Sequence, residues 1–213
     1  MPVLIKEHTE ELVHRSRGRP RDEVAKSRIL EAALELLEEQ SFADITTCAI
    51  AERAGASKAT IYRWWPNKAA VLMEALREAV AQELPFPDTG DLRKDVRIQL
   101  RNFTKLLTGR RGRIFRAFIA AAQSDTEVAE AFDVVWRKPR RATAKAILEH
   151  YRGRSLRENT DLELVMDVLY GPLYYRLLIA HLPISEKYAD ALADFVVTAI
   201  SKKDTASVAL EGL

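Results

Sequence analysis

Hydroxyl, methyl and cationic side chains gather in a short stretch that follows Gly55. At helical spacing one surface carries Ser57, Lys58, Ala59, Thr60, Tyr62 and Arg63. Cationic groups donate hydrogen bonds to guanine and to phosphate oxygens, and the methyl groups of alanine and threonine pack on the thymine methyl. This combination indicates a surface that contacts the major groove of DNA.

The residues around this surface predict two short helices joined by a tight turn. A hydroxyl from Thr46 or Thr47 caps the first helix, and Gly55 supplies the positive φ that ends it. Ser57 caps the second helix, Lys58 to Trp65, and the proline after it stops that helix. A helix-turn-helix is therefore the leading interpretation. An ordinary pair of packed helices is the alternative.

The side chains of this unit divide by the part of DNA that they suit. The candidates for contacts with base edges are Lys58, Ala59 and Thr60. The candidates for phosphate oxygens are Thr47, Tyr62 and Lys68. Arg63 suits either kind of contact. Of the two adjacent tryptophans, we expect Trp64 to lie in the domain core and Trp65 to contact the DNA backbone.

A basic stretch precedes the first expected helix, which begins at Glu23. Its glycine and proline favour an extended chain, and arginines on an extended arm can enter a narrow minor groove. The candidate contacts are Arg17, Arg19 and Arg21. A solvated basic tail is the alternative, and the neighbouring helix-turn-helix favours the arm. Residues 1–14 lack a sustained apolar run, so we expect disorder there and no signal peptide.

The residues from Glu23 to Leu76 resemble the DNA-binding domain of the TetR family of bacterial transcriptional regulators. The resemblance covers about a quarter of the chain and rests on Thr46-Thr47, Ala51-Glu52, Ala54-Gly55, Thr60-Ile61-Tyr62, Asn67-Lys68 and Leu72. By position it implies that the operator faces Ser57, Lys58, Ala59, Thr60 and Tyr62, and that Thr47, Tyr62 and Lys68 hold phosphates. Two residues depart from the family pattern, because Ser41 replaces the usual glycine and Cys48 an aliphatic residue or arginine.

The sequence predicts an all-α protein with three units. Residues 1–22 form a flexible basic N-terminal arm, and residues 23–86 form a three-helix helix-turn-helix DNA-binding domain. Residues 87–213 form a larger helical domain for effector binding and dimerisation. The boundary falls in the run from Pro85 to Gly90, which is the clearest break in composition.

Composition is typical of a cytoplasmic protein with local basic charge. The 33 Lys and Arg residues against 31 Asp and Glu residues leave a net charge of +2. The single cysteine, Cys48, excludes an internal disulfide. At an apolar helix position it is expected to be a small buried hydrophobic residue, with a redox switch as the lesser alternative. No apolar run approaches the ~18 residues that cross a membrane, so we expect no membrane partner.

The last two expected helices carry apolar stripes that are wider than one domain needs. The candidate dimer-interface residues are Leu164, Val168, Leu192, Val196 and Ile200. Two such helices from each subunit would form a four-helix bundle with two-fold symmetry, as the TetR resemblance also implies. A homodimer predicts a palindromic operator in double-stranded DNA. The alternative is that these stripes close the core of the subunit itself.

The resemblance also implies a pocket for a ligand in the second domain. The candidate lining residues are Phe103, Leu107, Phe115, Phe118, Ile119, Trp136, Met166, Tyr170, Tyr174 and His181. Apolar walls with a few polar tips suit a small apolar or aromatic effector. For each of these residues alone, core packing is the alternative.

No arrangement in the sequence is typical of an enzyme. The four histidines are scattered, and no glycine-rich phosphate loop follows a strand. We therefore expect no catalytic residues, no metal and no cofactor. The leading hypothesis is a homodimeric repressor that a small effector releases from its operator. The alternatives are a ligand-independent DNA-binding regulator and a helical protein-interaction adaptor.

Overall fold

The computed structural model describes residues 19–81 and 84–202. Within these ranges the regular structure is helical apart from isolated bridges at Arg152–Leu156 and Leu156–Ser201, which confirms the expected all-α class. The helices are α1 (Arg19–Glu39), α2 (Thr47–Ala54), α3 (Lys58–Trp64), α4 (Lys68–Ala81), α5 (Leu92–Thr108), α6 (Arg110–Ala121), α7 (Thr126–Ala131), the π-helix η1 (Phe132–Arg137), α8 (Lys138–Glu149), α9 (Leu162–Tyr174), the π-helix η2 (Tyr175–Ile179) and α10 (Glu186–Ile200).

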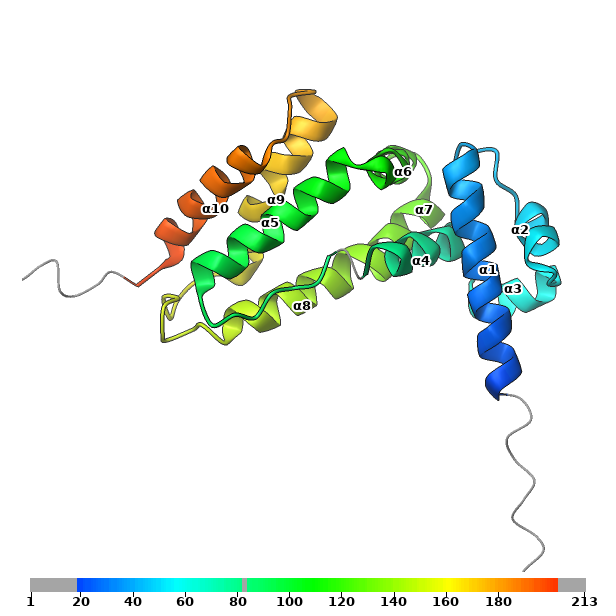
Figure 1. The fold of residues 1–213 in the computed structure, drawn as a ribbon, viewed down its shortest axis with the longest axis horizontal. Helices are drawn as coiled ribbons and strands as arrows, with labels where there is room; N and C mark the ends of the chain where they lie inside the picture. The colour runs from blue at the N-terminus through cyan, green and yellow to red at the C-terminus, as the bar shows by residue number, and fades with distance from the viewer. Residues whose placement is uncertain (1–18, 82–83, 203–213) are drawn as a thin grey trace, which may run out of the picture.

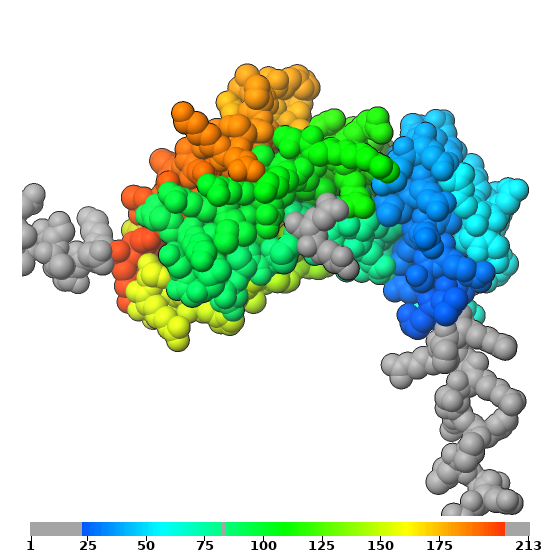
Figure 2. Space-filling view, in the orientation of Figure 1, coloured from blue at the N-terminus to red at the C-terminus, as the bar shows by residue number. Residues whose placement is uncertain are grey.

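The helices form two lobes that α4 connects. Figure 1 shows α1, α2 and α3 at one end of the molecule, and α5, α8, α9 and α10 at the other. The first lobe stands beside the larger second lobe in the space-filling view (Figure 2). Because α4 packs both on α1 and on the segment formed by α7 and η1, a movement in the second lobe can reach the first through α4.

Local capping residues place the helices of the first lobe where the sequence predicts them. Thr46 and Ser57 each accept a hydrogen bond from the backbone N–H three residues later, at 3.1 Å in both cases. Asn67 caps α4 in the same way at 2.9 Å. Gly55 has a φ of 59° and ends α2 in the left-handed region, where a side chain is disfavoured.

The first helix begins earlier than expected. α1 begins at Arg19 rather than at Glu23. Pro20 lies in its first turn, where backbone N–H groups have no acceptor within the helix, so the proline removes no hydrogen bond. Arg19 and Arg21 therefore belong to a helix instead of an extended arm. Arg17 lies outside the described residues.

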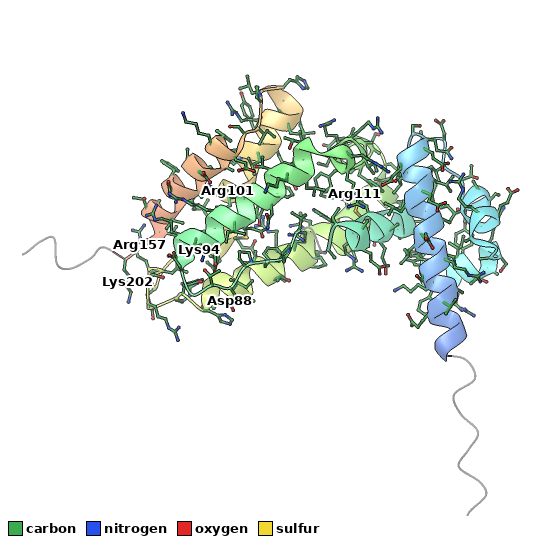
Figure 3. The ribbon with its side chains drawn as sticks, in the orientation of Figure 1. Asp88, Lys94, Arg101, Arg111, Arg157 and Lys202 are labelled. Carbon is green, nitrogen blue, oxygen red and sulfur yellow. The ribbon has the colours of Figure 1, made fainter. Side chains whose placement is uncertain are left out.

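A ladder of ion pairs joins α5 to α10 in the second lobe, and Figure 3 labels one member, Arg101. The pairs are Arg93–Asp194, Arg97–Asp194, Arg101–Asp190 and Lys105–Glu186, with N–O distances of 2.8, 2.6, 2.6 and 3.5 Å. Hydrogen bonds from the arginines hold the pKa values of Asp190 and Asp194 below their usual range. Exposed ion pairs are individually weak, so the ladder mainly fixes how the two helices align.

The helical chain of α9 (Leu162–Tyr174) continues through Gly171 and Pro172. α9 runs to Tyr174 with Pro172 inside it, and the π-helix η2 extends to Ile179. Proline has no N–H and crowds the preceding turn, so Pro172 removes one hydrogen bond from α9, and the π-helix η2 begins three residues after it.

Contacts of α6 tie the second lobe to the first. The ring of Phe118 on α6 lies 4.8 Å from the ring of Phe42, which follows α1. The guanidinium of Arg111, labelled in Figure 3, donates a hydrogen bond to the backbone carbonyl of Ala79 near the end of α4 at 3.0 Å. α6 therefore contacts both the connection between α1 and α2 and the helix α4, which links the two lobes.

Candidate nucleic-acid interface and effector cavity

The structure brings the predicted contact residues together on one face of α3. Ser57, Lys58, Ala59, Tyr62 and Arg63 are exposed, and Thr60 is half-buried. In the opposite direction, Ile61 is fully buried and anchors α3 to the core. The Ser57 and Thr60 hydroxyls lie 2.9 Å apart, so part of their hydrogen-bonding capacity is used within the helix cap. The outward face of α3 thus combines cationic, hydroxyl and methyl groups, as the sequence predicts.

Tyr62 and Thr47 meet at the N-terminal end of α2. The Tyr62 hydroxyl donates a long hydrogen bond of 3.4 Å to the Thr47 hydroxyl, and the Tyr62 side chain is 52% exposed. Backbone N–H groups at a helix N-terminus favour anions. The two hydroxyls are therefore placed where a phosphate can accept hydrogen bonds from both.

Lys68 is held against the turn that precedes α2. Its ammonium donates to the Phe42 backbone carbonyl at 3.2 Å and lies 4.8 Å from the centre of the Phe42 ring. The residue is half-buried. An ammonium has three N–H donors, so this bond leaves others for a phosphate.

The two residues that depart from the family pattern have different surroundings. The Ser41 hydroxyl donates to a carboxylate oxygen of Asp44 at 2.6 Å, which stabilises the turn after α1. Cys48 is exposed, so the expectation of a buried cysteine is wrong. A hydrogen bond with Cys48 raises the pKa of Lys58 above its ordinary value. Lys58 therefore stays cationic at the start of the contact face.

The burial expected for the two tryptophans is reversed. Trp65 is only 3% exposed, and its indole N–H donates to Glu74 at 2.7 Å. Trp64 is 36% exposed and lies near Lys26. The expectation that Trp64 is buried assumed a helix that runs through Trp65. Instead α3 ends at Trp64, and Trp65 has an extended backbone with φ −129° and ψ 131°. Trp65 is thus part of the core and is removed from the candidate DNA contacts.

A carboxylate on α4 joins three elements of the first lobe. Glu74 accepts the Trp65 indole hydrogen bond and pairs with the Lys26 ammonium at 2.9 Å. Burial raises its pKa, but the hydrogen bonds from Lys26 and Trp65 lower it, and the net direction is downward from 4.5. Glu74 therefore connects α1, α4 and the residue that ends α3.

We expect Glu74→Gln to lower stability at neutral pH and to lose this penalty in acid. A carboxylate with a lowered pKa stabilises the fold above its unfolded-state pKa, and this contribution disappears as pH falls through the folded-state pKa. The glutamine variant should therefore have a lower midpoint of urea unfolding than the parent at pH 7, and the two midpoints should begin to converge as the pH falls below about 4. A constant difference across this range would contradict the assignment.

A small apolar cavity lies in the second lobe between α5, α8, α9 and the segment that follows α4. Its lining includes Phe86, Gln99, Ala144, Met166 and Tyr170. Its volume is about 30 Å³, which is near the share of one water molecule in the liquid. A ligand larger than a water molecule would therefore need some lining side chains to move.

The cavity differs from the pocket that the sequence predicts, because only two of the predicted lining residues, Met166 and Tyr170, line it. Others pack against one another as an aromatic cluster, made of Phe103, Phe115, Trp136 and Tyr174. Leu107 and Phe118 are fully buried, Ile119 is half-buried, and His181 is exposed with a φ of 49°. Asp95 and Gln99 are lining residues with a detectable sequence signal, since both are polar residues on the apolar side of α5.

The outward apolar surface of α9 and α10 also differs from the prediction. Leu192, Val196 and Ile200 are buried in the subunit's own core. Leu164 remains 59% exposed and Val168 half-buried, and Phe195, which was not predicted, is 70% exposed. These residues line a groove between the two helices, which run side by side in Figure 1.

Residues 19–81 and 84–202 contain no helix that is long and apolar enough to cross a membrane. Across the same residues, no group of three or more His, Cys, Asp or Glu side chains is placed to hold a metal ion.

Family models match both lobes. Residues 29–75 match the model described as bacterial regulatory proteins, tetR family. Residues 86–196 match the tetracyclin repressor-like C-terminal domain. The two matched ranges coincide with the lobe that carries α3 and with most of the lobe that contains the cavity.

Individual relatives match over most of the chain. The HTH-type transcriptional regulator YdeS of Bacillus subtilis is 44% identical over 173 residues, which cover 81% of this chain and 87% of that protein. The DNA-binding transcriptional repressor TetR of Mycobacteroides abscessus is 27% identical over 180 residues, which cover 83% and 94%. The crystal structure of TetR family transcription regulator SCO0332 has a TM-score of 0.74 at 36% identity and covers 83% of this chain and 98% of that one. With its exposed recognition helix and both matched domains, the chain belongs to the TetR family of DNA-binding transcriptional regulators.

Proposed function

We propose that this regulator is a cytoplasmic homodimeric repressor, without catalytic activity, that a small apolar or aromatic effector releases from a palindromic operator. The observation that carries the proposal is the contact face of α3, from Ser57 to Arg63, which is exposed while Ile61 anchors the helix from behind. The exposed apolar residues on α9 and α10 support a second copy as partner. The cavity in the second lobe supports an effector.

The coupling that we propose runs through α4. Its first turn carries Lys68 beside the contact face, and its last turn accepts the hydrogen bond from Arg111 on α6. An effector that moves the walls of the cavity would shift α4 and change the separation of the two recognition helices. The ligand achieves this only if it binds the two conformations with different affinities. A regulator that binds DNA without a ligand remains the second candidate.

The proposal is tested by letting the purified protein select from random DNA duplexes and sequencing the selected ones. The selection is repeated at two salt concentrations. A palindrome with half-sites about one helical turn apart, or a multiple of it, is the expected result. Enrichment of a single unpaired half-site would contradict the dimeric arrangement. If no sequence is enriched and binding is absent even at low salt, the chain acts through protein contacts instead.

We expect Tyr62→Phe and Lys68→Ala each to weaken operator binding by about 3- to 10-fold at physiological salt, because each removes a phosphate contact. Lys68→Ala should also reduce the slope of log affinity against log salt by about 1, and Tyr62→Phe should leave the slope unchanged because the hydroxyl is neutral. Fluorescence anisotropy with the selected operator measures both.

Lys94→Ala is the matched control, since Lys94 is an exposed lysine in the second lobe (Figure 3). It should leave affinity and slope unchanged. If Tyr62→Phe and Lys68→Ala bind as tightly as the parent, the two side chains do not contact phosphate.

A further inference from the structure

Arg140 on α8 carries a charge that the described part of the chain does not neutralise. Its side chain is half-buried, and burial lowers its pKa below the ordinary value. Its contacts are the Leu84 backbone carbonyl at 3.3 Å and the rings of Phe86 and Trp136, 4.4 and 5.2 Å from the guanidinium carbon. No Asp or Glu carboxylate among residues 23–81 and 84–202 forms an ion pair with it. Burying a cation without a counter-charge is costly.

The next residue shows that a charge partner is available to an arginine here. Arg141 pairs with Asp167 at 2.7 Å and also with Glu163, both on α9. Arg140 points to the other side of α8, towards aromatic rings. The difference between these adjacent arginines indicates that Arg140 is placed for something other than a surface ion pair.

Arg140 adjoins the cavity. Phe86, over which its guanidinium lies, is also part of the cavity wall, and Ala144 lines the same cavity one turn further along α8. The guanidinium therefore lies behind the Phe86 side of the cavity.

A second unsatisfied group belongs to the same cavity. Gln99 is 7% exposed and lines it, and its amide N–H donates to the Tyr170 hydroxyl at 3.1 Å. Within the part of the chain that the structure describes, the amide oxygen of Gln99 has no hydrogen-bond partner. Because Tyr170 accepts this bond, its own O–H remains available as a donor. Buried polar atoms are rarely left unpaired, so the Gln99 amide oxygen and the Tyr170 O–H point to a ligand with polar atoms.

We propose that the cavity binds a compact aromatic or alicyclic carboxylate that also carries a hydroxyl group. The Phe86 side chain moves and thereby enlarges the cavity. The Arg140 guanidinium then pairs with the ligand carboxylate in place of its contact with the Phe86 ring. Gln99 accepts the hydrogen bond of the ligand hydroxyl through its free oxygen. Of the other lining residues, Asp95 already accepts hydrogen bonds from Thr89 and Tyr151, and the rest, apart from Tyr170, are apolar and pack on the ring. This inference rests on the proposed effector function and adds the chemical class of the effector.

Arginine suits this role because its planar guanidinium binds a carboxylate with two parallel hydrogen bonds. The small volume of the cavity favours a ligand with one ring over a larger one. An apolar ligand without charge would leave Arg140 unpaired, so the site should discriminate against it.

The test is calorimetric titration of the full-length protein, without DNA, with 3- and 4-hydroxybenzoate, their amides, and benzoate. Each hydroxybenzoate should bind at least about 10-fold more tightly than its amide, because the amide cannot form the charged pair. Arg140→Gln should abolish this preference, and Arg141→Gln, the matched control, should preserve it. Binding of the acids and amides with equal affinity, or an unchanged preference in Arg140→Gln, would overturn the carboxylate assignment.

The hydroxyl is tested with a second variant. The parent should bind at least one hydroxybenzoate more tightly than benzoate, and Gln99→Leu should remove that difference while it keeps the preference for acids over amides. A difference that persists in Gln99→Leu would overturn the role of Gln99. Circular dichroism and the thermal midpoint verify that each variant is folded. Arg140→Lys is a second variant at this position that keeps the positive charge.

Operator release separates this inference from the proposed function. If hydroxybenzoates bind in an Arg140-dependent manner and do not release the operator, the ligand class stands and the effector-responsive repressor fails. If none of the acids binds while amides or other neutral compounds release the operator, the repressor stands and the ligand class fails.

Discussion

Trp65→Ala is expected to lower the free energy of unfolding by about 3–5 kcal/mol, whereas Trp64→Ala should change it by less than about 1 kcal/mol. Trp65 is 3% exposed and belongs to the core that α1, α3 and α4 share, so its removal leaves a cavity. Trp64 is 36% exposed and loses mainly a surface contact with Lys26. The two residues are adjacent and identical in type, so each is the control for the other.

Urea unfolding followed by circular dichroism at 222 nm measures both changes. Trp65→Phe separates packing from hydrogen bonding, because phenylalanine keeps most of the ring and loses the N–H that donates to Glu74. It should cost about 1–2 kcal/mol, less than alanine. If Trp64→Ala proves the more destabilising change, the extended backbone at Trp65 does not turn its side chain into the core.

Phe195→Asp is expected to convert a dimer into a monomer and to weaken operator binding by about 100-fold or more, because a dimer holds two half-sites at once. Phe195 is 70% exposed, and Leu164 beside the same groove is 59% exposed. Apolar side chains of this size are usually covered when they cluster at one groove. A carboxylate there would be buried without a partner in the dimer and solvated in the monomer.

Sedimentation equilibrium gives the association state of the variant, and fluorescence anisotropy gives its affinity for the selected operator. Val134→Asp is the matched control, since Val134 is an apolar residue on η1 that is 52% exposed and lies outside this groove. It should remain dimeric. A Phe195→Asp variant that is still a dimer would move the interface away from the groove between α9 and α10.

Features that depend on neighbours in the chain were predictable from the sequence. The caps at Thr46, Ser57 and Asn67 and the left-handed Gly55 need only a side chain and the backbone of the next few residues. They fix the bounds of α2 and α3 and thereby select which residues of α3 face outward. The all-α class and the contact face from Ser57 to Arg63 were determined in the same way.

The tertiary structure decided which apolar residues are covered and by what. Periodicity placed Leu192, Val196 and Ile200 on one stripe, but α5 and α9 of the same subunit occupy that side, so Phe195 is the residue left exposed. The predicted pocket became an aromatic cluster because its rings fill the space between helices that are distant in sequence.

The same limit applies to the polar groups of the cavity. Gln99 and Arg140 lie on different helices. Nothing in the sequence near either residue reveals that, among the described residues, the amide oxygen of Gln99 has no donor and the guanidinium of Arg140 has no carboxylate partner. Local sequence determines how a helix begins, ends and presents its faces, because those interactions span a few residues. Whether a side chain is satisfied depends on atoms brought from elsewhere in the chain, and only the packed structure supplies them.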